Sequence, residues 1–464
     1  MYLFARDRYI GYINFRAERQ SVKDMSIKTF RGGVHPNYMK HLTNSEPIKV
    51  LEAGAEVIIP LSQHIGKICD PLVKKGDYVK VGQKIGDVDA FVSSPVHASV
   101  SGTVKAVEPR LSNGGVKVMS VVIENDYTYT MFEDSGLIGD YEHMSREEII
   151  DVIHKAGIVG MGGAGFPMHI KVDPPKDKII KYIIVNGAEC EPYLSSDHRT
   201  MLEHTDELIF GIKVLMSISN ARRTFIAVED NKPDVIEKLL AMKLPYSIEV
   251  VPLETKYPQG SEKHLIKAVT GLEVPHGKLP ADVGVIVNNV DTCISLYNAL
   301  VRGLPLIRRR VTVSGGAVNN PGVYDVPLGM TFRELFEAAG GFKEEPSKII
   351  MGGPMMGAAQ VSLDVPVVKT TSGILAFTKK EGRTYGESPC LRCGKCVDVC
   401  PMHLMPNAIA TAARLNDTEK AEKLNAMDCV ECGSCSYTCP SHRYLVERIR
   451  LAKSRLQMIA ASRK

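Results

Sequence analysis

A twelve-residue cysteine pattern occurs twice near the end of the chain and constrains the fold more than any other feature. The first run is CLRCGKCVDVCP, starting at residue 390, and the second is CVECGSCSYTCP, starting at residue 429. Both have the spacing C-x2-C-x2-C-x3-C-P, in which three close thiolates bind one iron cube and the fourth binds the neighbouring cube. The spacing predicts two [4Fe–4S] clusters, with the ligand sets Cys390, Cys393, Cys396 and Cys439, and Cys429, Cys432, Cys435 and Cys400.

Two structural zinc sites are the alternative for these thiols. Zinc needs one closed set of four ligands, usually from two separated pairs, and this repeated run does not have that form. A cytosolic chain keeps thiols reduced, which favours metal over disulfides. Residues 403–428 contain two helix-like segments that would separate the cysteine loops. We therefore expect a helical two-[4Fe–4S] ferredoxin-type domain over 380–464. Its last helix is basic, and either docks on an acidic partner or anionic lipid or is a solvated helix that offsets the negative clusters.

The composition is that of a soluble multidomain protein. Its 464 residues suggest about three domains. Hydrophobic residues make up 44% and charged residues 24%, and the apolar runs are far shorter than the ~18 residues needed to cross a bilayer. The first residues mix charge with aromatic side chains and do not form a secretory signal. A net charge of +4 is too weak to indicate a nucleic-acid binder. We expect no nucleic-acid partner and a cytoplasmic location.

Residues 140–305 alternate short apolar runs with helical stretches, which is typical of a parallel sheet covered on both faces. Expected strands are 181–185, 224–228, 248–251 and 283–287, and expected helices lie near 200–219, 232–243, 261–270 and 291–302. The pattern predicts a doubly wound α/β domain.

A glycine-rich run, GIVGMGGAGFP, precedes the first of these strands. Backbone N–H groups in such a loop can approach a phosphate closely. Ser145 and Glu148 form a capping box that opens a helix before the run, so the context differs from an ordinary dinucleotide fingerprint.

Three segments in order, GMGGAGFPMHIK, KYIIVNGAECEP and VIVNNVDT, resemble the flavin and NADH segments of the 51-kilodalton subunit of respiratory complex I. The resemblance implies that FMN phosphate is held by Gly160, Gly162, Gly163 and Lys171. It places flavin ring contacts at Asn186, Glu189, Asn288, Asn289 and Thr292. It places the nicotinamide and ribose of NAD(H) near Phe166 and Glu191, with Gly260 and Glu262 on the opposite wall. The sequence departs from that family at Met161, Ala188 and Ser261, where the family has Arg, Asp and Glu.

The flanking segments predict three further modules. Residues 1–40 form an N-terminal arm whose FRGGVHP segment lies across another domain, and residues 41–135 resemble a lipoyl-type barrel-sandwich without its carrier lysine. Residues 306–375 resemble a soluble-ligand-binding β-grasp module with a linker, and Thr331 and Glu334 cap its helix. The later segment IMGGPMMGAA favours a tight turn against an apolar wall over a cofactor contact.

This series of modules resembles the C subunit of the Rnf electron-transport complex over residues 26 to about 450. The resemblance implies a peripheral subunit on the cytoplasmic face of the inner membrane, within an ion-translocating ferredoxin:NAD oxidoreductase. Its partners would be the other Rnf subunits, NAD(H), and ferredoxin through those subunits. FMN would exchange hydride with NAD(H), and the two clusters would carry single electrons. Hydride transfer requires no acid or base, so no catalytic side chain is assigned.

Three alternatives remain open at this point. The chain could be the diaphorase subunit of a soluble NADH-dependent, hydrogenase-like assembly, although the GGVHP arm argues against it. The second alternative is the A subunit of the sodium-pumping NADH:quinone reductase, which resembles the N-terminal half of this chain. The ferredoxin-type C-terminal segment favours the Rnf subunit instead. The third is a cluster-bearing adaptor that lacks flavin because of Met161, Ala188 and Ser261.

Overall fold

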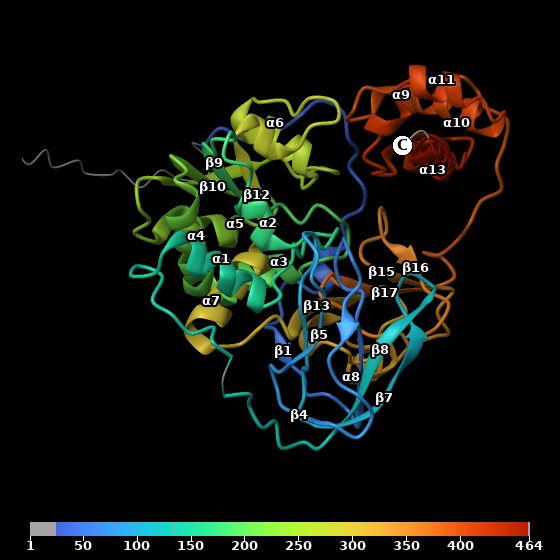
Figure 1. The fold of residues 1–464 in the computed structure, drawn as a ribbon. Coiled ribbons are helices and arrows are strands. Elements are labelled where there is room, and N and C mark those ends of the chain that lie inside the picture. Colours follow the sequence, from blue (N-terminus) through green and yellow to red (C-terminus); the bar gives the residue numbers. More distant parts are fainter. Residues whose placement is uncertain (1–24, 134, 463–464) are drawn as a thin grey trace, which may run out of the picture.

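The computed structural model describes residues 25–133 and 135–462, in which four modules follow an N-terminal arm (Figure 1). Residues 1–24 of the predicted arm lie outside the described residues. The described arm runs along the central domain, where Lys28 bridges to Leu253 and Val34 to Tyr257, as predicted for the GGVHP segment. Among the described helices, none combines the length and apolar character that crossing a bilayer requires.

The first module is the predicted barrel-sandwich. Two antiparallel sheets, with strand orders β2-β8-β7-β4 and β3-β5-β6, enclose a core that includes Val57, Ile59 and Ile123. Its strands are β2 (Glu56–Pro60), β3 (Asp70–Pro71), β4 (Tyr78–Val79), β5 (Lys84–Asp87), β6 (Val96–His97), β7 (Gly102–Leu111) and β8 (Lys117–Asn125).

The central module is a parallel four-stranded sheet in the order β11-β10-β9-β12, covered on both faces. The strands are β9 (Tyr182–Gly187), β10 (Arg223–Glu229), β11 (Ile248–Leu253) and β12 (Val285–Asn289). The helices are α1 (Arg146–Lys155), α2 (Met168–Val172), α3 (Ser196–Glu203), α4 (Thr205–Ser219), α5 (Pro233–Ala241), α6 (Glu262–Thr270) and α7 (Val290–Arg302). Alternate residues of a strand face opposite sides, so Ile183 packs in the core with α1, α4, α5 and α7 while Ile184 packs in the core with α6. This confirms the doubly wound fold.

One predicted helix of this domain, near 200–219, is wrong in its extent. The structure has α3 and α4 in its place, separated at His204, which has non-helical φ and ψ of −123° and 36°. The Thr205 hydroxyl donates to the Met201 carbonyl at 2.6 Å, a local bond that competes with the helical backbone pattern. The capping box of Ser145 and Glu148 and the first-turn Pro233 are present as predicted.

The third module is the β-grasp fold predicted for 306–375, a six-stranded sheet in the order β1-β14-β13-β17-β15-β16. Its elements are β1 (Lys49–Val50), β13 (Arg308–Ser314), β14 (Gly322–Pro327), α8 (Phe332–Ala338), β15 (Lys348–Met351), β16 (Ala358–Ala359) and β17 (Gly373–Phe377). Strand β1 lies within the 41–135 range predicted for the barrel-sandwich, but it pairs with β14 and so belongs to the sheet of the β-grasp module. Thr331 and Glu334 form the expected capping box on α8.

The fourth module is helical and forms the upper right of the molecule in Figure 1. Its helices are α9 (Lys395–Asp398), α10 (Pro406–Arg414), α11 (Thr418–Lys423), α12 (Ser434–Tyr437) and α13 (Leu445–Ser462). Ile409 of α10 and Ile449 of α13 are fully or almost fully buried in its core. The long helix α13 therefore closes the module over the segments that carry the cysteines.

Candidate functional site

The carboxyl ends of β9 and β12 lie side by side, and this is where the strand order of the sheet reverses. The chain proceeds from β9 outward to β10 and β11 and then returns to β12 on the other side of β9. Asn186 is paired in register with Asn289 at these ends. In open α/β sheets, ligands bind in the crevice at such a switch point. The sequence-predicted Asn186, Asn288 and Asn289 therefore meet where a nucleotide would be expected.

The glycine-rich loop over 159–167 is held beside this crevice. The Gly160 N–H donates to the Phe166 carbonyl at 2.9 Å, and the Met161 N–H donates to the buried Thr292 hydroxyl at 2.9 Å. Gly162 lies against Asn289, since a Cβ on Gly162 would be 3.6 Å from the Asn289 Cβ. Gly162 and Gly163 are exposed. Within the described residues, their N–H groups have no hydrogen-bond acceptor, which suits an anion approaching from solvent.

Lys171 extends from α2 toward the same strand end. Its Nζ donates to the Val287 carbonyl at 2.9 Å and pairs with Glu262 at 3.2 Å. The resemblance assigned Lys171 to the FMN phosphate and Glu262 to a wall of the NAD(H) site, and these two side chains are in direct contact. An ammonium group at this position can neutralise a phosphate bound on the glycine loop.

Buried polar side chains line the base of the crevice. Asn288 is 3% exposed, and its Nδ2 atom has no partner among the described residues. A buried donor without a partner costs free energy, so this amide fits a ring carbonyl of a bound flavin. Asn289 donates to Asp197 at 2.7 Å. Burial, and next the Glu189 carboxylate, raise the pKa of Asp197 to about 7.

Glu189 anchors the start of α3 and does not face open solvent. Its carboxylate accepts the N–H groups of Asp197 at 2.7 Å and His198 at 3.3 Å. The ammonium of Lys40, from the N-terminal arm, donates to the Glu189 carbonyl at 2.7 Å. Burial lowers the pKa of Lys40. Lys40 was not predicted, because a lysine in a polar arm has no sequence signal for burial.

The opposite wall is the loop that opens α6. The Gly260 carbonyl accepts from Asn186 at 2.8 Å, and the Gly260 N–H donates to the Cys190 sulfur at 3.2 Å. A Cβ on Gly260 would lie 3.3 Å from that sulfur and 3.5 Å from the Ala188 Cβ. The absence of a side chain thus lets the loop approach β9 closely.

Glu191 is held by the glycine- and methionine-rich loop of the β-grasp module. Its carboxylate accepts the N–H groups of Met355 at 3.0 Å and Met356 at 2.9 Å. Burial raises the pKa of Glu191 to about 7. Gly353 packs on the same carboxylate, and a Cβ at this position would overlap its Oε2 atom. A ribose at Glu191 would have to exchange with these backbone donors.

The three positions that depart from the complex I pattern have structural roles in this chain. Met161 is 1% exposed and packs with Val159 and Leu306. Ala188 is fully buried in the core beneath α6. Ser261 precedes α6, and its hydroxyl lies 2.9 Å from His264 Nδ1. These residues leave the polar groups at the strand ends in place.

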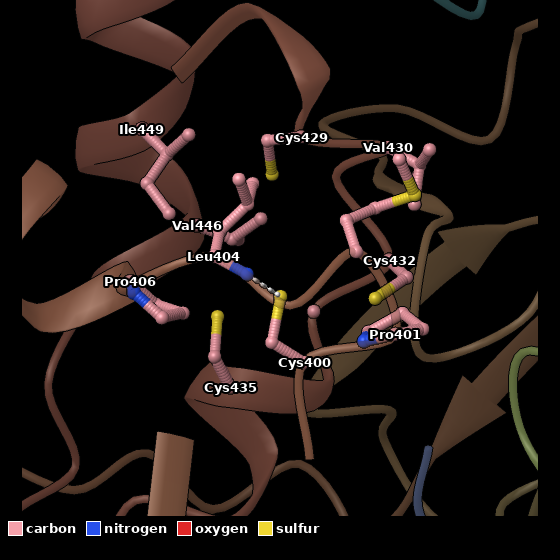
Figure 2. A pocket seen from close by; sticks show the side chains of 12 residues that line it. Cys400, Pro401, Leu404, Pro406, Cys429, Val430, Cys432, Cys435, Val446 and Ile449 are labelled. Carbon is pink, nitrogen blue, oxygen red and sulfur yellow. Dashed lines mark hydrogen bonds between the residues drawn. The ribbon is translucent and has the colours of Figure 1, made fainter. Parts of the chain in front are cut away.

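The predicted second cysteine set lines one pocket, shown in Figure 2. Its other walls include Leu404, Val446 and Ile449. Its cysteines are Cys400, Cys429, Cys432 and Cys435. The Leu404 N–H donates to the Cys400 sulfur at 3.4 Å, and the Glu431 N–H to the Cys429 sulfur at 3.4 Å. Such donors stabilise thiolates that ligate a cluster. Four thiols around an apolar pocket fit an iron–sulfur cube.

The backbone around the first cysteine run has the same conformation as the backbone around the second run. Gly394 and Gly433, each two residues before the third cysteine of a run, have φ of 80° and 79° and begin the one-turn helices α9 and α12. Burial raises the pKa of Cys396, and the neighbouring Cys439 and Cys390 raise it further. Cys390 and Cys393 are exposed, whereas Cys400, Cys432 and Cys435 are each 7% exposed. Cys396, Cys439 and Cys429 are half-buried, so the first set is the more exposed of the two and the second the more buried.

The basic side chains of α13 are largely engaged within the chain. Arg450 and Lys453 pair with Glu431, and Arg448 pairs with Glu387. Arg455 donates to the Ala413 carbonyl at 2.7 Å. Because these side chains are already paired within the chain, the contacts favour a helix whose positive charge offsets the negative clusters. They argue against a basic face that is free to dock on a partner or a lipid.

Family models match four successive parts of the chain. They are the RnfC barrel sandwich hybrid domain over 28–128, the Nuo51 FMN-binding domain over 153–298, the SLBB domain over 310–359 and the 4Fe-4S dicluster domain over 384–440. The cofactor classes predicted from the sequence thus agree with the domain types that are present.

Curated relatives match along almost the whole chain. The C subunit of the Na⁺-translocating ferredoxin:NAD⁺ oxidoreductase complex of Acetobacterium woodii is 48% identical over 443 residues, which is 95% of this chain and 100% of the relative. The C subunit of the proton-translocating complex of Clostridium ljungdahlii is 48% identical over 429 residues, 92% of this chain and 94% of the relative. The C subunit of a Haemophilus influenzae ion-translocating oxidoreductase complex is 39% identical over 94% of this chain and 67% of the relative. This chain belongs to the RnfC family, the C subunits of Rnf electron-transport complexes.

Proposed function

We propose that this chain is the subunit of an ion-translocating ferredoxin:NAD oxidoreductase complex at which NAD(H) exchanges electrons. The reaction for which the relatives are named supports this role, and the FMN-binding and dicluster domains supply the cofactor types that it needs. When bound, FMN takes or gives hydride at the nicotinamide and exchanges single electrons with iron–sulfur clusters. The chain itself contributes position, electrostatics and exclusion of water.

The glycine loop and Lys171 would hold the FMN phosphate. The N–H groups of Gly162 and Gly163 have no acceptor among the described residues and can donate, and Gly160 fixes the base of the loop through its bond to Phe166. Lys171 lies at the end of β12 and would exchange part of its pairing with Glu262 for the phosphate. Thr292 would act indirectly. Its hydroxyl accepts the Met161 N–H and so fixes the position of the glycine loop.

The strand ends would hold and orient the flavin ring and the nicotinamide. Asn186, Asn288, Asn289 and Glu189 lie at the ends of β9 and β12, and Asn288 offers a donor that has no partner among the described residues. For NAD(H) we propose Phe166 and Glu191 on one wall and Gly260 and Glu262 on the other. When the nucleotide binds, Glu191 would be released from the glycine- and methionine-rich loop of the β-grasp module, residues 352–357.

The eight clustered thiols would hold two [4Fe–4S] clusters in the crossed sets. The inner set is Cys400, Cys429, Cys432 and Cys435, and the outer set is Cys390, Cys393, Cys396 and Cys439. Burial in an apolar pocket and N–H donors to sulfur set the potential of such clusters.

The proposed location is the cytoplasmic side of the inner membrane, as a peripheral subunit. NAD(H) is a cytoplasmic substrate, and other Rnf subunits would supply the membrane spans and the contact with ferredoxin. The proposed modules are residues 1–40, 41–135, 140–305, 306–375 and 380–464, with β1 of the 41–135 segment completing the sheet of the β-grasp module.

The observation that carries the proposal is the convergence at one switch point of the glycine loop, Lys171 and the Asn288 Nδ2 donor, which has no partner within residues 25–133 and 135–462. The test is anaerobic purification of the full chain, followed by iron and flavin analysis. We expect about eight irons and one FMN per chain. Cys393→Ala and Cys432→Ala should each lose about half of the iron, and Cys69→Ala, which alters a buried thiol in the barrel-sandwich, should lose none. About eight irons without FMN would instead favour the flavin-free adaptor.

A further inference from the structure

Tyr257 links the loop of the proposed nucleotide site to the inner cysteine set. Its hydroxyl donates to the Cys432 carbonyl at 2.8 Å, and the side chain is 1% exposed. Tyr257 lies in the short connection between β11 and α6, three residues before Gly260. One residue thus touches the backbone of a proposed cluster ligand while its own loop forms a wall of the flavin site.

A continuous buried layer fills the space between the two sites. Val34, Cys190, Tyr257 and Cys432 form one apolar cluster, with Met355 packed against it. Cys190 accepts the Gly260 N–H on the nucleotide side of this layer, and Cys432 lines the cluster pocket on the other side. Apolar side chains packed in this way disfavour water in the space that they occupy.

The N-terminal arm clamps the layer from outside. Val34 and Tyr257 exchange two backbone hydrogen bonds at 2.8 and 2.9 Å, and the Gly33 N–H donates to the Val399 carbonyl at 2.9 Å. Gly33 has a φ of 86°, and a Cβ at this position would lie 2.6 Å from the Tyr257 carbonyl oxygen, so only glycine fits. His264 adds a contact from α6, with its Nε2 atom 3.2 Å from the Pro401 carbonyl.

The contacts that dock the cysteine module therefore lie around its inner set. Tyr257 reaches Cys432, the arm reaches Val399, and His264 reaches Pro401, which follows Cys400. Cys390 and Cys393 of the outer set are exposed.

We propose that the cluster held by Cys400, Cys429, Cys432 and Cys435 is the one that exchanges electrons with the flavin site, and that Tyr257 is the residue that positions and tunes it. The inference rests on the proposed function. Electrons pass singly: the donor loses one electron, the inner cluster gains it, and the outer cluster receives it before the next transfer. No bond is formed or broken, and Tyr257 transfers no proton.

The Tyr257 hydroxyl favours the reduced cluster electrostatically. Its O–H dipole points toward the Cys432 peptide, and a donor near a cluster stabilises the added negative charge in a low-dielectric site. Tyr257→Phe removes the dipole and keeps the ring in the buried layer. The potential of the inner cluster should therefore fall, and that of the outer cluster should stay unchanged.

The test is a redox titration of the anaerobically purified full chain, followed by electron paramagnetic resonance. Cys432→Ser and Cys393→Ser assign the two signals. In Tyr257→Phe, we expect the signal that is lost in Cys432→Ser to shift to lower potential and the other signal to stay in place. A shift of about 59 mV would correspond to a tenfold change in the equilibrium constant for one-electron reduction of the cluster. The matched control is Tyr324→Phe, since Tyr324 is also 1% exposed and donates to a backbone carbonyl, that of Asn320, at 3.0 Å. It should shift neither signal.

Reduction by NADH tests the order of the clusters. In Cys393→Ser, NADH should still reduce the inner cluster, whereas in Cys432→Ser it should no longer reduce the outer one at the rate of the unmodified chain. Full-rate reduction of the outer cluster in Cys432→Ser, or a shift of the outer signal in Tyr257→Phe, would overturn this inference alone. If dithionite but not NADH reduces the clusters of the unmodified flavin-loaded chain, the proposed function itself fails.

Discussion

The buried ammonium of Lys369 donates to the carbonyl of Gly157 at 2.7 Å, at the residue where the chain leaves the first helix and enters the glycine-rich segment. The same ammonium donates to the Pro95 carbonyl at 2.7 Å. Three modules, namely the barrel-sandwich, the α/β domain and the β-grasp module, thus meet at one fully buried lysine. Burial lowers the pKa of Lys369 to about 7.

Replacing Lys369 by Met should destabilise the chain more at high pH than at neutral pH. The variant leaves two buried carbonyls without a donor, at a cost of about 1–3 kcal/mol. In the unmodified chain, the pKa of Lys369 is about 7 in the folded state and 10.5 in the unfolded state. Between about pH 7 and 10.5 the unfolded state therefore binds more protons at this lysine, and this makes stability rise with pH. Lys369→Met lacks this rise. Denaturant unfolding between pH 7 and 9.5 checks the prediction, with the exposed Lys380→Met as control. Parallel pH profiles for the Lys369 variant and the unmodified chain would contradict it.

Thr292→Val should loosen the glycine loop. The substitution leaves the Met161 N–H buried without its acceptor, which costs about 1–3 kcal/mol in stability, and the affinity for FMN should fall several-fold. Thr200→Val is the matched control, because Thr200 is fully buried in the same domain and its hydroxyl has no partner among the described residues. Thermal unfolding and FMN fluorescence titration measure both effects. Equal losses in the two variants would argue against a specific role of Thr292.

The sequence predicted the parts of the structure that depend on local pattern. The strand expected at 181–185 is β9, at 182–187, because a continuous run of Ile and Val between turns leaves few alternatives. The cysteine spacing predicted the grouping of Cys400 with Cys429, Cys432 and Cys435 in one pocket. Asn186 and Asn288 were assigned to the flavin ring through the resemblance to the complex I subunit, and they lie at strand ends, where ligands of such sheets bind.

The contacts that the sequence did not predict join residues far apart in the chain. Lys40, Lys232 and Lys369 are buried against backbone carbonyls, whereas lysine is normally a surface residue and nothing in its neighbours signals burial. Tyr257 and Cys432 are separated by 175 residues. The GGPMMG loop was predicted to be a turn against an apolar wall. Met355 does pack in an apolar cluster, but the loop also binds the Glu191 carboxylate, which no local pattern indicates.

Lys171→Met should weaken FMN binding by at least tenfold, or about 1.4 kcal/mol. The ammonium lies beside the β12 strand end and would face a phosphate on the glycine loop. Because salt screens such an attraction, the affinity of the unmodified chain should also fall more steeply with ionic strength than that of the variant. Titration of deflavinated chain with FMN at two salt concentrations measures this. Lys155→Met, at an exposed lysine of α1 that pairs with Asp151, should leave the affinity unchanged, and a similar loss in that control would refute the assignment.

Between about pH 4.5 and about 7, Glu191→Gln should remove a contribution that makes the unmodified chain less stable as pH rises. Burial raises the pKa of Glu191 from 4.5 to about 7, so the folded state keeps a proton that the unfolded state releases, and stability falls with pH across this window. The Glu191 share is of order 3 kcal/mol, so the stability of the variant should fall less, or rise more, with pH across this window than that of the unmodified chain. Asp197 and Glu229, whose pKa values burial also raises to about 7, act in the same direction as Glu191. His64 and His169, whose pKa values burial lowers to about 4, act in the opposite direction. Glutamine keeps only one acceptor oxygen, so one of the Met355 and Met356 amides should exchange faster with deuterium. Glu447→Gln, at an exposed position of α13, should change neither the slope nor the exchange, and an unchanged slope in Glu191→Gln would show that the carboxyl does not titrate in this range.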